Sequence, residues 1–278
     1  MALEDINFAE STALVTGGSS GIGRAIAEEL VARGVRQLVI VAQDETKLSQ
    51  VAKEIQSSKS GVEVRTIKAN LSSHDGPKNV KKEIDGFGWT VDILVNNAGF
   101  GRKYNFAEDP ENDTSLDCVD LMVRAVVEMS LLFLPGMKER RKGGILNVGS
   151  TACYQPVPFT AIYAASKAFV LSFSQAVRQE NLTGETGVRI ACVVPGVTNT
   201  NLDGKGHGET RGPISKVGID EPEDVAKVAV DALRDNAAER VVGWNNYAFH
   251  TVQSLMPDSV VAKVVAMSRG APGEGNED

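Results

Sequence analysis

A glycine-rich segment near the N terminus most limits the folds open to this chain. Residues 16–23, with the sequence TGGSSGIG, follow an apolar run at 13–15 and overlap the helically spaced Ile22, Ile26 and Leu30. A turn of this kind, between a strand and a helix, lets the backbone come close to a diphosphate, whose charge the helix N terminus stabilises. We therefore expect a strand–turn–helix unit suited to a nucleotide.

Apolar runs and helical segments alternate along the rest of the chain. Strands are predicted at residues 12–16, 37–42, 62–68, 91–96, 144–148, 188–194 and 240–243. Helices are predicted at residues 21–33, 45–57, 74–87, 114–141, 160–181 and 222–236, the fourth bent or broken at Pro135 and Gly136. This alternation predicts an α/β fold, a doubly wound, Rossmann-like parallel sheet of about seven strands with helices on both faces.

One domain is expected to contain all 278 residues, because neither a repeat nor a linker divides them. Residues 1–10 are predicted to be a loose lead-in and residues 269–278 a flexible acidic tail. The glycine-rich, polar stretch 201–218 is interpreted as a mobile loop over the substrate; a surface excursion without a binding role is the alternative.

Composition limits the partners and the location. The formal net charge of −7 gives no basic surface for nucleic acid, and no metal site is predicted. Residues 119–137 are the most apolar helical stretch, but Asp120, Arg124 and Glu128 interrupt it, so no membrane span is expected. Residues 1–10 lack the apolar core of a signal peptide, and the three cysteines show no pairing pattern. We therefore expect a cytoplasmic protein with reduced thiols.

Tyr163 and Lys167, four residues apart, share one face of the helix predicted at 160–181. A phenol titrates near ~10, too high for proton transfer at neutral pH. A neighbouring ammonium favours the phenolate and lowers the pKa, so that the hydroxyl can give or take a proton. Alone, such a pair is usually an ordinary feature of a helix, and its meaning depends on the motifs around it.

Two further motifs accompany this pair. The sequence NNAG at 96–99 ends the apolar run 91–95, and Ser150 follows the run 145–148, thirteen residues before Tyr163. With the glycine-rich segment and the tyrosine–lysine pair, they resemble the short-chain dehydrogenase/reductase family in order and spacing, from residue 12 to about residue 200. The stretch 147–170 is most similar to a broad subgroup of generic reductases, which does not identify a substrate.

The resemblance implies an oxidoreductase that interconverts a ketone and a secondary alcohol by hydride transfer. Tyr163 would exchange the proton on the substrate oxygen, Lys167 would lower the pKa of that tyrosine and hold the nicotinamide ribose, and Ser150 would donate a hydrogen bond to the carbonyl oxygen. The residues that the resemblance assigns to the cofactor are Gly17, Ser19, Ser20, Gly21, Ile22, Gly23, Gln43, Asn70, Leu71, Asn97, Ala98, Gly99, Tyr163, Lys167, Pro195, Gly196, Val197 and Thr200.

The choice of nucleotide depends on the end of the second strand. In the family, NAD-type members carry an acid at the position of Ala42, and NADP-type members often carry an arginine at the position of Gln43; this chain has neither. The missing acid removes a like-charge penalty against a 2′-phosphate, and Arg24 or Lys47 could supply positive charge, which favours NADP. Asp44 supports the alternative, because a contact with the ribose diol would favour NAD.

Met122 departs from the family pattern. The family usually has an asparagine in this helix that helps to hold a water between the lysine and solvent, and alignment on Ala125 and residues 134–137 places Met122 there. A thioether is a weak acceptor and cannot donate a hydrogen bond. The explanations left open are a shifted register or another group for the water, altered chemistry, and a nucleotide-binding protein with a regulatory or non-redox role.

The expected partners are a small-molecule carbonyl or alcohol substrate and further copies of the chain. The helices predicted at 114–141 and 160–181 carry more apolar surface than one sheet face needs, and the family commonly pairs through them. A homodimer or homotetramer is therefore expected.

Overall fold

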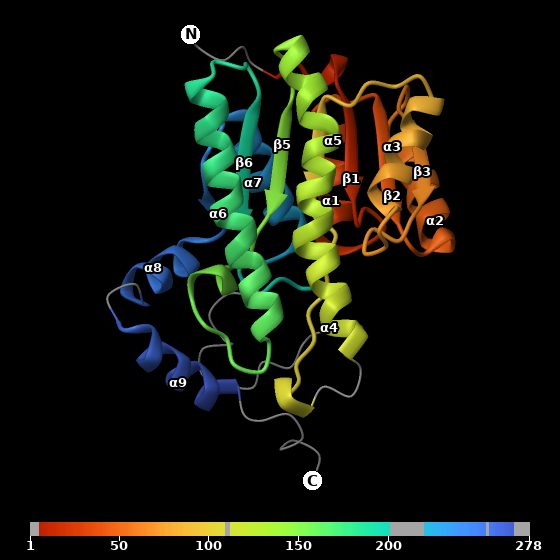
Figure 1. Ribbon diagram of the computed structural model, residues 1–278. Helices are drawn as coiled ribbons and strands as arrows, with labels where there is room; N and C mark the ends of the chain where they lie inside the picture. Colours follow the sequence, from red (N-terminus) through yellow and green to blue (C-terminus); the bar gives the residue numbers. More distant parts are fainter. Residues whose placement is uncertain (1–5, 109–111, 201–219, 254–255, 270–278) are drawn as a thin grey trace.

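Seven parallel strands form the centre of this computed structural model, which describes residues 6–108, 112–200, 220–253 and 256–269. Their order across the sheet is β3-β2-β1-β4-β5-β6-β7 (Figure 1). The bounds are β1 Thr12–Thr16, β2 Gln37–Ala42, β3 Glu63–Lys68, β4 Ile93–Asn96, β5 Gly144–Val148, β6 Arg189–Val194 and β7 Arg240–Val241. The direction of winding changes between β1 and β4, which leaves a crevice at the carboxyl ends of the strands where such sheets bind ligands.

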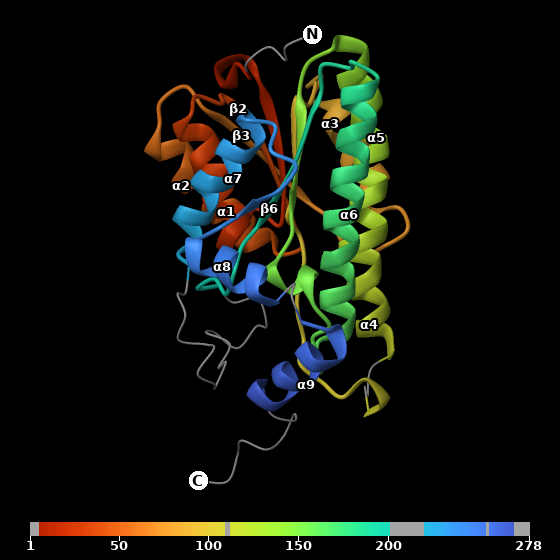
Figure 2. The same cartoon turned by 90° about the vertical axis from the view of Figure 1, so that its left-hand side faces the viewer.

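Helices cover both faces of the sheet, because successive strand residues point to opposite sides (Figure 2). Val15 and Ile40 pack on one side, whereas their neighbours Leu14 and Val39 pack on the other. The helices on the first side are α1 Gly21–Ala32, α2 Glu45–Ser58 and α7 Pro222–Arg234. Those on the second are α3 Gly76–Gly86, α5 Ala125–Arg140 and α6 Ala161–Thr183. The predicted doubly wound sheet is confirmed, and the strands predicted at 12–16, 37–42 and 144–148 have the observed bounds.

The prediction of a helix at 114–141 that bends or breaks at Pro135 and Gly136 is wrong about where the irregularity lies. The chain forms α4 (Asn112–Val119), a π-helical turn η3 (Asp120–Arg124) and then α5. Pro135 lies inside α5 and does not interrupt it. Proline removes a hydrogen bond to the carbonyl four residues earlier, that of Leu131, but both side chains are on the exposed surface of the helix, where water can replace that bond. The irregular turn is η3 instead, close to the carboxyl edge of the sheet.

Two helices after β7 are not predicted by the sequence patterns: α8 (Trp244–Gln253) and α9 (Asp258–Arg269). Both lie beyond the carboxyl ends of the strands (Figure 1). Val261 and Val265 of α9 pack against Ala164 of α6 and Val157, so the end of the described chain rests on the start of α6. The loop predicted at 201–218 and nearly all of the predicted tail lie outside the described residues.

Residues 8–10 of the predicted lead-in contact the core, whereas residues 1–5 lie outside the described residues. Phe8–Glu10 form a short 3-10 helix, η1, and Phe8 is buried in the core beneath α1 and α7. Its aromatic ring therefore fastens the chain to the sheet before β1 begins, which the acidic composition of this stretch did not indicate. Within the described ranges, no helix has the length and apolar character needed to cross a membrane.

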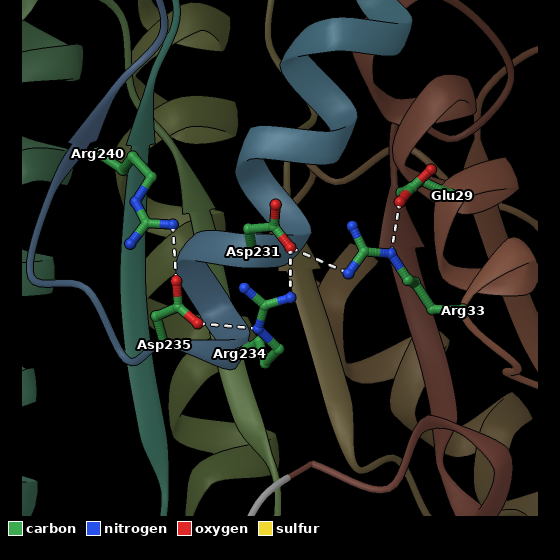
Figure 3. A network of polar contacts seen from close by, with 6 residues as sticks. All are labelled: Glu29, Arg33, Asp231, Arg234, Asp235 and Arg240. Carbon is green, nitrogen blue, oxygen red and sulfur yellow. Dashed lines mark hydrogen bonds and ion pairs between the residues drawn. The ribbon is translucent and has the colours of Figure 1, made fainter.

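Charged residues join α1, α7 and β7 at the amino-terminal end of the sheet (Figure 3). Arg33 contacts Glu29 at 2.7 Å and Asp231 at 3.0 Å, which links α1 to α7. The chain of contacts continues from Asp231 through Arg234, Asp235 and Arg240. These side chains are partly exposed, so each pair contributes little to stability, and the network mainly fixes how α7 sits on α1.

Candidate active site

Lys167 is a buried cation at the carboxyl edge of the sheet. Its side chain is 6% exposed, and its ammonium donates a hydrogen bond of 2.7 Å to the carbonyl oxygen of Val148, the last residue of β5. The Nζ atom lies 5.7 Å from the centre of the Tyr163 ring, one helical turn earlier on α6. Loss of hydration on burial lowers the pKa of Lys167 to about 8. The fold therefore holds a positive charge beside the phenol.

Ser150 lies two residues beyond the carbonyl that Lys167 contacts. It is 9% exposed, and its Oγ accepts a hydrogen bond of 3.2 Å from the backbone N–H of Ala152. This bond caps the short helix η4 (Thr151–Tyr154) and uses a lone pair of the hydroxyl. The hydroxyl hydrogen remains available for donation to a substrate oxygen. β5 and α6 thus bring Ser150, Tyr163 and Lys167 to the same end of the sheet.

The glycine-rich turn is shaped for close approach of a ligand. Gly17 has φ of +65° and donates its N–H to the carbonyl of Val41 at 2.8 Å, so the chain turns sharply after β1. A Cβ on Gly23 would lie 2.3 Å from both Asn97 Nδ2 and the Gly17 carbonyl oxygen, so only glycine fits there. The turn ends at Gly21, where α1 begins with unpaired backbone N–H groups that favour an anion.

Asn97 ties the ends of β1 and β4 together beneath this turn. Its side-chain amide donates to the Thr16 carbonyl at 2.9 Å, and its backbone N–H donates to the Thr16 hydroxyl at 2.9 Å. The N–H of Ala98 also donates to that hydroxyl, at 3.1 Å. Since β1 and β4 are the strands between which the winding changes, these bonds fix the width of the crevice.

A cleft of about 380 Å³ lies beside the N terminus of α1. Residues from α1 and from the segment after β6 line it, among them Ser20, Gly21, Arg24 and Thr200. The methyl group of Thr200 is close to Gly21, 3.1 Å from the position of a Cβ on that glycine. The structure therefore brings the predicted segment at 195–200 next to the predicted diphosphate turn.

The groups proposed to select the nucleotide already have partners. Gln43 donates to the side chain of Asn70 at 2.8 Å. Asp44 caps α2 by accepting from the backbone N–H of Lys47 at 3.0 Å, a bond that lowers the pKa of Asp44. Arg24 pairs with two glutamates, at positions 28 and 54, each at 2.8 Å. Each of these three side chains is thus already held by a hydrogen bond or an ion pair.

Met122 lies in the π-helical turn η3 and is 1% exposed. Its sulfur is 3.0 Å from the position that a Cβ on Gly99 would take, so the thioether packs directly on the NNAG segment. Cys118, one turn earlier, is also buried, and burial raises the pKa of its thiol to about 11. The wall of the site next to Gly99 is therefore apolar and sulfur-rich, with a methionine at the position aligned with the family's asparagine.

Tyr154, the last residue of η4, is held by contacts with residues that lie far from it along the chain. Its ring packs with Val170 and Val194, and its hydroxyl donates to the carboxylate of Glu239. Burial, followed by that bond, raises the pKa of Tyr154. Glu239 precedes β7 and also accepts a bond of 3.1 Å from Gln175 of α6. The sequence did not indicate Glu239, because the partners lie far from it along the chain.

The contacts described above occur in a Rossmann-like α/β sheet, the class of fold that binds nucleotides at the carboxyl edge of its strands. A family model described as short chain dehydrogenase matches residues 11–209, more than half of the chain. The protein belongs to this family of oxidoreductases.

Individual relatives agree with that assignment. The chain is 34% identical over 262 residues to very-long-chain 3-oxoacyl-CoA reductase of Mus musculus, covering 91% of this chain and 78% of the relative. It is similar to the structure of L-sorbose reductase from Gluconobacter frateurii complexed with NADPH and L-sorbose (TM-score 0.73, 26% identity, 86% and 97% coverage). A 3-ketoacyl-(acyl-carrier-protein) reductase from Brucella melitensis complexed with NADH has a TM-score of 0.72 at 28% identity, with 85% and 98% coverage.

Proposed function

We propose that the protein is an NADP(H)-dependent oxidoreductase that interconverts a ketone and a secondary alcohol. The observation that carries this proposal is the buried ammonium of Lys167 beside the ring of Tyr163, at the end of the strand that leads to Ser150. A charge held away from water acts strongly on a neighbouring phenol. An ordinary helix surface would leave this lysine in solvent.

The glycine-rich turn fits a dinucleotide, because Gly17 and Gly23 let the backbone turn tightly against Asn97, and Gly21, with φ of +52°, begins α1 without a side chain. The cofactor supplies the hydride. The protein then contributes three actions: Ser150 donates a hydrogen bond to the substrate oxygen, Tyr163 transfers a proton to or from that oxygen, and Lys167 stabilises the phenolate. Asn97 holds the turn in place from below.

The substrate is proposed at the level of chemical class. The Mus musculus relative is named for 3-oxoacyl-CoA, and the Brucella melitensis structure for 3-ketoacyl groups on a carrier protein. A ketone two carbons from a thioester is therefore the first class to test. The apolar wall formed by Met122 and Cys118 is compatible with a substrate that has an aliphatic part.

We test the proposal by following the loss of NADPH absorbance with a panel of 3-oxoacyl thioesters of different chain length, a simple aliphatic ketone and a keto sugar. Ketone-dependent oxidation of NADPH supports the reductase. Tight NADPH binding without turnover on any member of the panel would favour the second candidate, a nucleotide-binding protein with a regulatory or non-redox role. Met122 is the observation that keeps this candidate open.

The replacement Gln43→Arg should tighten NADPH binding by about 3- to 10-fold, because a guanidinium can form a charge-assisted contact with the 2′-phosphate. NADH has no such phosphate, so its affinity should stay within about twofold. Fluorescence titration of both nucleotides measures the effect, with Gln43→Met as the control that loses the bond to Asn70 without gaining charge. An equal gain for NADH would contradict this account of selection.

The replacement Met122→Asn should raise turnover or shift its pH dependence, because an asparagine can help to hold water near Lys167. NADPH affinity should remain nearly unchanged. The melting temperature should fall, since an amide at this buried position that lacks a partner costs about 1–3 kcal/mol. Met122→Leu keeps the volume and adds no polar group, and serves as the matched control. If Met122→Asn changed neither turnover nor its pH profile, the proton path would not depend on this position.

We further propose a homodimer or homotetramer that pairs through α5 and α6. Leu131 on α5 is 68% exposed, and Phe169 on α6 is 37% exposed and stacks on Phe173 with ring centres 5.7 Å apart. Burial of these side chains against a second copy would stabilise the pair.

The free thiols of the chain's three cysteines support a cytoplasmic, reducing location.

A further inference from the structure

Asp220, which follows residues 201–219, forms backbone hydrogen bonds with the segment that precedes them. Its backbone N–H donates to the carbonyl of Val197 at 2.9 Å, and its carbonyl accepts from the N–H of Asn199 at 3.0 Å. These bonds form a parallel bridge between Thr198 and Asp220, next to the start of α7. The segment after β6 is therefore held against a residue that follows it by more than twenty positions.

The side chain of Asp220 makes the more specific contacts. One carboxylate oxygen, Oδ2, accepts from the backbone N–H of Gly196 at 3.2 Å and from the side-chain amide of Asn246 at 3.2 Å. The same amide of Asn246, on α8, donates to the carbonyl of Val242 at 2.7 Å, which anchors it to the residue that follows β7. Partial burial raises the pKa of Asp220, while the bonds from Gly196 and Asn246 act in the opposite direction.

Gly196 is packed tightly against this pair. A Cβ at position 196 would lie 2.3 Å from Nδ2 of Asn246, so the backbone passes too close to α8 for any side chain. Glycine has the greatest backbone freedom of any residue, and a glycine that must hold one conformation needs external contacts to fix it. Asp220 supplies such a contact at the N–H, and Asn246 supplies the packing.

We propose that Asp220, supported by Asn246, is a positioning residue that fixes residues 195–200 for the nicotinamide half of the cofactor. The inference rests on the proposed function and on the family resemblance, which implies that residues 195–200 lie beside the nicotinamide. Thr200 at its far end is packed near Gly21, so the segment spans from the end of β6 to the diphosphate turn. A shift at Gly196 would move the nicotinamide contacts and leave the adenosine end, at β2 and β3, in place.

The experiment compares two ligands in the full-length protein: NADPH, and adenosine 2′,5′-bisphosphate, which lacks the nicotinamide half. In Asp220→Ala, NADPH affinity should fall by about 10-fold, the expected effect of losing a charged hydrogen-bond acceptor. Affinity for the bisphosphate should stay within about twofold. Asp220→Asn keeps an acceptor oxygen and should restore most of the NADPH affinity. Asp224→Ala, an exposed aspartate in the first turn of α7, is the matched control and should behave like the parent.

A double replacement tests the partnership. If the two side chains act as one unit, Asp220→Ala with Asn246→Ala should bind NADPH as Asp220→Ala does, because the unit is already lost. Unchanged NADPH affinity in Asp220→Ala, or equal loss for both ligands, would overturn the inference. The two proposals can fail separately. If the parent protein reduces no ketone but Asp220→Ala still loses NADPH binding selectively, the proposed reaction is refuted and the positioning role is supported.

Discussion

The replacement Tyr163→Phe should lower ketone reduction by at least about 100-fold, the usual contribution of a general acid. Tyr163 is the proposed general acid, and Ser150 is assigned only a hydrogen bond to the substrate oxygen. The ring of Tyr163 and the burial of Lys167 should persist, so NADPH affinity should stay within about threefold. Stopped assays over a range of enzyme concentrations, with NADPH titration alongside, measure both quantities.

A matched control separates this effect from a general loss of an aromatic hydroxyl. Tyr247 on α8 is 62% exposed, and Tyr247→Phe should retain parent activity. Full ketone reduction by Tyr163→Phe would remove the acid–base role of this residue. The binding-protein alternative would then be the better account of the chain.

The replacement Lys167→Met should abolish measurable turnover and, in the same protein, raise the stability of the cofactor-free fold. Burial lowers the pKa of Lys167 from 10.5 to about 8. At pH 7 the charged lysine therefore has a higher free energy in the folded protein than in the unfolded chain. Relief of this penalty, less the lost bond to Val148, should increase the free energy of unfolding by about 1–3 kcal/mol.

The predicted gain in stability of Lys167→Met over the parent depends on pH. Lysine is charged in both states below about pH 8, so the penalty is fully present there. Between pH 8 and 10.5 the folded state releases the proton first, and the penalty disappears. The stability gap between Lys167→Met and the parent should therefore shrink as the pH rises from 7 to 10, which urea denaturation at each pH measures. Lys82→Met, at an exposed position on α3, is the control; a constant gap would show that burial of the charge is not its cause.

Most of the sheet was predictable because its central strands are buried on both faces and appear as continuous apolar runs. The runs at 12–16, 37–42 and 144–148 have nearly no polar interruption, and their bounds match the structure. The long helix was less predictable: composition shows neither the π-helical turn at Asp120–Arg124 nor the tolerance of α5 for Pro135. Those features depend on packing against Gly99 and on exposure to solvent, which no local pattern reveals.

The candidate site was also predictable only where its geometry is local. Spacing on one helix face was enough to pair Tyr163 with Lys167, because that geometry is local. The bond from Lys167 to Val148 and the burial that lowers the lysine's pKa depend on how α6 lies on β5, and they required the fold. Asp220 and Asn246 gave no signal at all, since one follows residues 201–219 and the other lies in an unpredicted helix.

Transfer of the hydride itself tests the central claim most directly. The protein is incubated with NADPH carrying deuterium at the reactive carbon of the nicotinamide, on each face in turn, together with a ketone that the panel identifies. We predict that deuterium from one face appears on the carbinol carbon of the alcohol, and that Tyr163→Phe forms at least about 100-fold less of this labelled alcohol in the same time. Alcohol without deuterium from either labelled cofactor, or no alcohol despite saturating NADPH binding, would contradict the account.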